Sequence, residues 1–151
     1  MSGGSKAPSY HAPPYDSPLS GATIHELRCL DTRIHLGYHL VDHIVKTLFA
    51  ELPSSAYVLV TDTNLARLGV VERFHRAFAT SSTPGAPVRL LAYEVAPGEE
   101  SKCRETKAAI EDWMLEHRLT RDTVVLACGG GVIGDLVGFV AATVRARWSV
   151  S

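Results

Sequence analysis

The sequence has little of what marks secreted, membrane-spanning or nucleic-acid-binding proteins. Its three cysteines (Cys29, Cys103 and Cys128) are an odd number without metal-ligand spacing, which favours reduced thiols in a cytoplasmic protein. The formal net charge is −1, so no basic surface for nucleic acid or an anionic membrane is expected. The longest apolar run, about 132–144, is interrupted by Asp135 and is too short to cross a bilayer. The amino terminus lacks the apolar segment of a signal peptide. These absences predict a soluble, cytoplasmic chain.

The remaining composition is that of one ordinary globular domain behind a polar leader. Hydrophobic residues make up 46% of the 151 residues and charged residues 21%. Residues 1–22 hold four of the eight prolines, with serine and glycine filling much of the rest. Such a stretch cannot bury enough apolar surface to offset the entropy of ordering it. We therefore predict a disordered leader over 1–22 and a folded domain over 23–143.

Within the domain, short β-forming segments alternate with helical patterns. The strands are predicted at 32–37, 56–62, 88–95 and 122–128. The helices are predicted at 40–48, at 65–78 with Thr63 or Asn64 as N-cap, around the stripe Ile110, Trp113, Met114 and His117, and at 132–143. Residues 83–87 are predicted to form a loop. This alternation predicts an α/β fold with a mainly parallel sheet and flanking helices.

Three polar or glycine-rich turns follow strands of the predicted sheet. They are Asp62 to Asn64, Pro97 to Lys102 and Gly129 to Gly131. Ligands of open α/β sheets bind beyond the carboxyl ends of the strands, and these three turns fall there. Three such turns on one edge, called the rim below, predict a binding site more strongly than any one of them.

The glycine turn matches a phosphate-binding pattern, although in an unusual place. Gly129, Gly131 and Gly134 fit G-x-G-x-x-G, in which backbone N–H groups and a helix N-terminus face a pyrophosphate. The usual fingerprint opens the first strand–helix unit, whereas this one opens the last unit present. The structural alternative is tight packing of the strand against the helix that follows.

Each charged residue of the rim also has two interpretations. Asp62 suits a ribose hydroxyl, or it caps the next helix together with Thr63 and Asn64. Lys102 suits a phosphate and Glu99 a ribose, or the segment is a solvated helix start capped by Ser101. A carboxylate in the first helical turn interacts favourably with the helix dipole, which stabilises the helix by about 0.3–1 kcal/mol. That contribution does not explain why Asp135 is the only charge in an otherwise apolar helix.

The histidines offer a weak signal for a metal. His35, His39 and His43 stand at four-residue intervals, which resembles the spacing of helical metal ligands. Gly37 and the strand-like pattern around it argue against one helix carrying all three, and no carboxylate completes the set. We expect these side chains to pack or to be solvated, and we predict no metal site.

The segments "DTN", "PGEESK" and "DTVVLACGGGVIGDLVGFVAAT" together resemble 3-dehydroquinate synthase, in detail the amino-terminal domain found in fungal pentafunctional AROM polypeptides. The resemblance runs from about Ile34 to Thr143. It implies a Rossmann-like domain that binds NAD. Carried onto matching positions, it implies that the NAD contacts are Asp62, Thr63, Asn64, Glu99, Glu100, Ser101, Lys102, Gly130, Gly131, Val132 and Asp135.

The resemblance also implies a reaction, the conversion of 3-deoxy-D-arabino-heptulosonate 7-phosphate to 3-dehydroquinate in the shikimate pathway. NAD and zinc are its implied cofactors, and family members are generally homodimers. Two alternatives stay open. One is the group of iron-dependent alcohol and glycerol dehydrogenases, whose turn usually reads GGGSxxDxxK, whereas Val132, Gly134 and Phe139 favour the synthase. The other is a nucleotide-binding remnant without catalysis.

The chain departs from the family pattern after Thr143. The family continues with an Arg-Gly pair and another strand, whereas this chain reads "VRARWSVS". We interpret residues 144–151 as a non-homologous tail of a truncated product, leaving the sheet with an unpaired edge. The zinc ligands, the substrate lysines and the helical second domain of the family are not found, so no catalytic or metal-binding residue is assigned.

From this departure we predict that the chain alone does not catalyse the synthase reaction. The measurement is phosphate release from the heptulosonate phosphate by purified protein supplied with NAD and zinc. Turnover at a rate typical of the family would contradict the prediction.

Overall fold

The computed structural model describes residues 24–30, 32–82, 88–144 and 147–150. The predicted leader over 1–22 and the predicted loop over 83–87 lie outside the described residues. The chain divides into two compact units, Met1–His39 and Leu40–Ser151, and each is described by itself. No helix among the described residues is long and apolar enough to span a membrane.

The first unit contains a two-stranded antiparallel sheet. Strand β1 (His25–Cys29) pairs with β2 (Thr32–Leu36), so that His25 lies opposite Leu36 and Cys29 opposite Thr32. The sequence predicts β2 but not β1, and it places β2 first in the parallel series. That placement is wrong, because β2 pairs with β1 in a separate antiparallel sheet and is not a strand of the parallel one.

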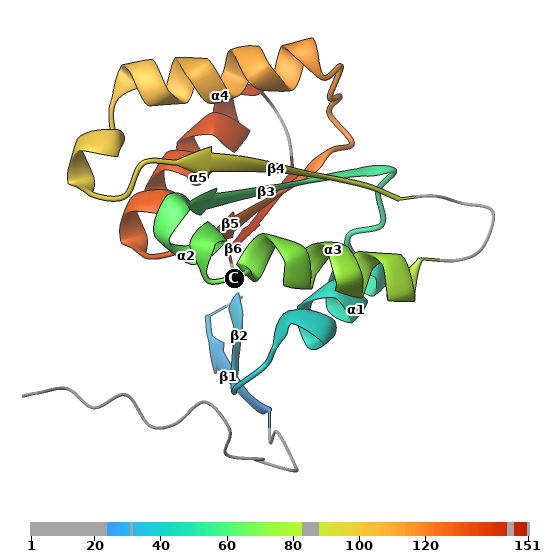
Figure 1. Cartoon of the computed structure of the whole chain (residues 1–151). Coiled ribbons are helices and arrows are strands. Elements are labelled where there is room, and N and C mark those ends of the chain that lie inside the picture. The colour runs from blue at the N-terminus through green and yellow to red at the C-terminus, as the bar shows by residue number, and fades with distance from the viewer. Residues whose placement is uncertain (1–23, 31, 83–87, 145–146, 151) are drawn as a thin grey trace, which may run out of the picture. The chain divides into compact units, whose positions relative to one another are not determined.

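The second unit contains the predicted parallel sheet, with strand order β4-β3-β5-β6 (Figure 1). The strands are β3 (Ala56–Asp62), β4 (Arg89–Val95), β5 (Val124–Cys128) and β6 (Arg147–Val150), and every neighbouring pair is parallel. Residues 147–150 of the predicted tail extend the sheet as β6 beside β5, which is therefore an interior strand. Among the described strands the sheet still ends on an unpaired edge, which is that of β6. The assignment of residues 144–151 as a non-homologous tail stays a prediction.

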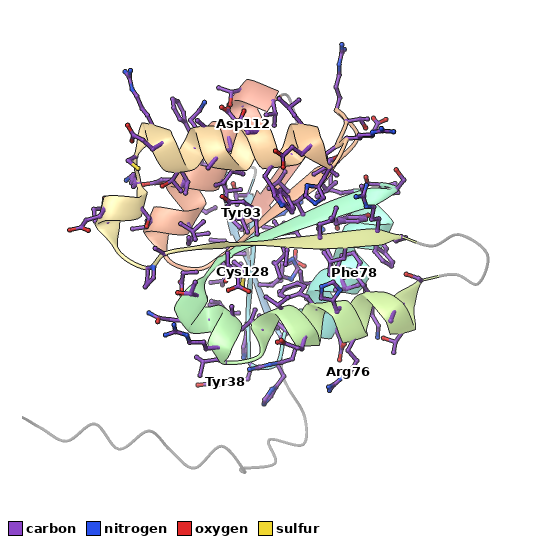
Figure 2. All side chains as sticks on the ribbon, turned by 45° about the horizontal axis from the view of Figure 1, so that its top comes forward. Tyr38, Arg76, Phe78, Tyr93, Asp112 and Cys128 are labelled. Atoms are coloured by element: carbon purple, nitrogen blue, oxygen red, sulfur yellow. The ribbon has the colours of Figure 1, made fainter. Side chains whose placement is uncertain are left out.

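Helices cover both faces of this sheet, because successive side chains of a strand point to opposite faces. Tyr57 and Leu59 of β3 pack with Phe74 and Phe78 on one face, where α1 (Val41–Glu51) and α3 (Val70–Ser81) lie. Val58 and Val60 pack on the other face, where α4 (Arg104–Glu116) and α5 (Gly131–Val144) lie. The labelled Phe78 and Tyr93 mark these two layers in Figure 2.

The segment predicted as one helix over 65–78 is two helices. Helix α2 (Thr63–Arg67) ends before Gly69, and α3 begins at Val70. Gly69 adopts a left-handed conformation with φ of 75°, which glycine tolerates and most other residues avoid. The apolar spacing continues across this break, so periodicity alone does not reveal it.

Thr61 carries an unsatisfied polar group: its buried hydroxyl has no hydrogen-bond partner among the described residues. A buried polar group without a partner costs about 1–3 kcal/mol of stability. Valine has nearly the same shape as threonine and suits a strand. We expect Thr61→Val to raise the free energy of unfolding by about 1 kcal/mol, measured by urea denaturation. A loss of stability instead would mean that the hydroxyl is satisfied in solution.

Candidate functional site

The register of the parallel sheet brings the three predicted turns to one edge. Asp62 at the end of β3 lies opposite Val95 at the end of β4, and Thr61 lies opposite Cys128 at the end of β5. Neighbouring strands of a sheet are about 4.8 Å apart. The segments that follow all three strands therefore begin side by side, with α2, the 3₁₀ turn η1 (Glu99–Ser101) and the start of α5 at the same end of the sheet (Figure 1).

Asp62 is the N-cap of helix α2. Its Oδ1 accepts hydrogen bonds from the backbone N–H groups of Asn64 at 2.9 Å and Leu65 at 3.0 Å. The prediction that Thr63 or Asn64 caps this helix is wrong, because both already belong to its first turn. Within the described part of the chain, no hydrogen bond engages Oδ2 of Asp62. The cap thus fixes the carboxylate and leaves one oxygen for a ligand.

The three consecutive glycines differ in the physical reason for having no side chain. A Cβ atom on Gly129 would lie 2.8 Å from Cγ1 of Ile133, which is buried in the core, so strand–helix packing accounts for this glycine. A Cβ atom on Gly130 or Gly131 would meet nothing within 4 Å. None of the three has a positive φ. Nothing within the described chain therefore requires glycine at positions 130 and 131.

Lys102 and Asp135 form an ion pair that joins two of the turns. Lys102 Nζ donates to Asp135 Oδ2 at 2.6 Å and lies 3.6 Å from Glu99 Oε1. The hydrogen bond to Asp135, with the charge of the same carboxylate, raises the pKa of Lys102 above its usual value. The side chains remain 40% and 63% exposed. The pair accounts for the isolated charge in α5 and keeps both groups within reach of a ligand.

The other predicted contact residues occupy the same rim in different ways. Ser101 is buried, and its hydroxyl donates to the carbonyl of Ala96 at 2.6 Å. The alternative that Ser101 caps α4 is wrong, since Cys103 occupies that position and makes no side-chain cap bond. Asn64, Glu99 and Glu100 are exposed, whereas Thr63 and Val132 are partly buried.

A cavity of about 430 Å³ adjoins the Lys102–Asp135 pair in the groove between α4 and α5. Only Lys102 and Asp135 of its seven lining residues are predicted from the sequence, and Arg104, Lys107 and Phe139 are among the five that are not. Their spacing offers a signal in hindsight: Phe139 follows Asp135 by one helical turn, and Lys107 follows Cys103 by one turn. The remaining lining residues are Lys102, Cys103, Asp135 and Leu136.

The described residues contain no group of three histidine, cysteine or acidic side chains that could hold a metal ion. His35 lies in β2, His39 has a positive φ of 56° between the elements, and His43 lies in α1. The three regularly spaced histidines therefore share no helix.

Comparison with known proteins shows that the sequence of this chain is similar to one enzyme family. Residues 92–147 match the family model described as 3-dehydroquinate synthase N-terminal. The chain is 80% identical over 140 residues to the pentafunctional AROM polypeptide of Malassezia globosa, which covers 93% of this chain and 8% of that protein. It is 66% identical over 142 residues to that of Mycosarcoma maydis, covering 91% and 8%. The chain thus spans about 8% of the length of these curated relatives.

Solved structures support the same fold. A 2-deoxy-scyllo-inosose synthase in complex with carbaglucose-6-phosphate, NAD+ and Co2+ matches with a TM-score of 0.62 at 17% identity, over 85% of this chain and 34% of that one. At this identity the match concerns the fold alone. A 2-epi-5-epi-valiolone synthase from Streptomyces hygroscopicus subsp. jinggangensis, solved with NAD+ and Zn2+, matches with a TM-score of 0.54 at 26% identity, over 71% and 29%.

The glycine turn yields a matched pair of variants. We expect Gly129→Ala to lower the free energy of unfolding by about 1–3 kcal/mol, because its Cβ overlaps buried Ile133. Gly130→Ala meets open space at a permitted φ, so its stability should stay within about 1 kcal/mol of the parent. Urea denaturation of both variants is the measurement. Equal losses in the two would contradict the assignment of different roles.

Proposed function

Because the chain belongs to the 3-dehydroquinate synthase family, by its match over residues 92–147 and its high identity to AROM polypeptides, we propose that it supplies the NAD-binding rim of such a synthase. The observation that carries this proposal is the convergence of three polar turns around Gly130 and Gly131, which no contact within the described chain requires to be glycine. The likeness to a synthase solved with NAD+ at 26% identity supports it.

Each part of the rim suits one part of a dinucleotide. The second carboxylate oxygen of Asp62 would accept hydrogen bonds from ribose hydroxyls. The open space at Gly130 and Gly131, with the N-terminus of α5 behind it, would admit a pyrophosphate close to backbone N–H groups. Lys102 and Asp135 would then contact the remaining part of the cofactor with one donor and one acceptor group. The residues present therefore fit NAD.

The reaction we propose for the whole protein is the family's conversion of 3-deoxy-D-arabino-heptulosonate 7-phosphate to 3-dehydroquinate, with loss of phosphate. Bound NAD supplies hydride transfer, and the role of this chain is to bind and orient it. Zinc ligands are not supplied by the described residues, which contain no suitable group of three.

The cellular setting forms part of the same proposal. A cytoplasmic location fits the three cysteines, which form no disulfide. A homodimer of the complete synthase, a sugar-phosphate substrate, and the absence of nucleic-acid or membrane partners complete the proposal.

Calorimetric titration of the chain with NAD tests the proposal directly. We expect Gly130→Val to weaken NAD binding at least about tenfold, because its side chain fills the space offered to the pyrophosphate. We expect Lys102→Met to weaken it as well, because a charged donor is lost.

The matched control is Arg76→Met, which removes an exposed cation on the outer side of α3 (Figure 2). Its NAD affinity should equal that of the parent, and all three variants should keep the parent's unfolding midpoint in urea. No binding by the parent, or equal binding by parent and Gly130→Val, would refute the NAD site.

A further inference from the structure

We propose that Lys107 is a positioning residue, which ties helix α4 to helix α5 and thereby holds the Lys102 ammonium against Asp135 at the rim. The proposal rests on the NAD-binding function for its biological meaning. Its structural claim is that the Lys102–Asp135 pair depends on the contacts of Lys107, and this claim does not depend on NAD binding.

Lys107 contacts both helices. Its Nζ donates to Oε1 of Glu111 on the same helix at 2.6 Å, and it lies 5.3 Å from the centroid of the Phe139 ring on α5. Thr143, one helical turn beyond Phe139, donates its hydroxyl to the same Glu111 oxygen. The Lys107–Glu111 pair is thus attached to α5 at two successive turns by a cation–π contact and a hydrogen bond. A simple surface pair within one helix makes neither contact.

The Lys107–Glu111 pair is more buried than the Lys102–Asp135 pair at the rim. The Lys107 and Glu111 side chains are 18% and 22% exposed, against 40% and 63% for Lys102 and Asp135. Solvent and salt screen a partly buried pair less than an exposed one. Burial alone would raise the pKa of Glu111. The hydrogen bonds from Lys107 and Thr143 and the charge of Lys107 outweigh it and hold that pKa below its usual value. Glu111 is therefore ionised at neutral pH.

The two pairs lie one after the other in the same groove. Phe139 follows Asp135 by one turn on α5, and Lys107 follows Lys102 by five residues at the start of α4. Lys102, Lys107, Asp135 and Phe139 all line the cavity of about 430 Å³. An exposed ion pair is too weak to fix the separation of two helices by itself. The apolar core between the helices sets their overall separation. The inner contact holds the first turn of α4 against α5, and the outer pair next to that turn forms because of it.

The experiment that isolates this dependence is an NMR titration of the Lys102 side chain in the parent and in Lys107→Met. Methionine keeps an unbranched apolar stem and removes the charge. In the parent, the hydrogen bond and charge of Asp135 raise the pKa of Lys102 above its usual value. If Lys107 positions the pair, the pKa of Lys102 falls back toward its usual value in Lys107→Met. Direct electrostatics predict the opposite sign, because removal of a nearby cation favours the charged form of Lys102.

Two further variants complete the design. Lys107→Arg keeps the charge over the Phe139 ring and should restore the raised pKa of Lys102. Lys46→Met, which removes an exposed lysine from α1, should leave it unchanged. A pKa of Lys102 that stays the same or rises in Lys107→Met would overturn the proposal, whatever the outcome with NAD.

A double-mutant cycle on NAD affinity tests whether the positioning of Lys102 by Lys107 affects NAD binding. We expect Lys107→Met to weaken NAD binding about three- to tenfold in the parent, and by less than twofold in Lys102→Met, because the effect passes through Lys102. Equal losses in both backgrounds would refute the positioning role. No binding by the parent would refute the proposed function and leave the Lys102 titration to decide this inference.

Discussion

The parallel direction of the strands is the constraint on which the site depends. Parallel strands joined by helical crossovers end at the same edge of a sheet, so every segment that leaves β3, β4 and β5 starts at one rim. The sheet itself therefore brings together polar residues that follow three different strands, and their contacts with one another are not needed for this. The hydrophobic layers on both faces hold the register, because a one-residue slip would turn Val58 and Val60 toward the wrong layer.

The sequence predicts the parts of this fold whose signal is local. Strand β3 has the predicted bounds, since its β-forming run is bounded by turn residues on both sides. Local signal fails where the cause is a single residue or a distant partner. The break between α2 and α3 depends on the backbone of Gly69, and β1 is stabilised by β2 rather than by its own pattern.

The candidate site likewise has features that the sequence predicts and features that it does not. The three turns are recognisable from composition and position, and the resemblance points to the same residues. Their roles are not recognisable, because Gly129 and Gly130 look alike in the sequence and differ only by the neighbouring Ile133 side chain. The partnership of Lys102 with Asp135 spans 33 residues of chain, and no periodicity links them. Whether these residues contact NAD stays a prediction.

A structural role at the rim does not compete with a binding role. Asp62 caps α2 through one oxygen, which orders the other oxygen without occupying it. The Lys102–Asp135 pair is exposed, and an exposed pair adds so little stability that a ligand can rearrange it at small cost. The packing of α4 against α5 rests instead on their shared apolar core, where Ile110 and Met114 meet Leu136 and Val137. Because packing and ligand contact rest on different residues, the rim can exchange partners while the helices that present it stay in place.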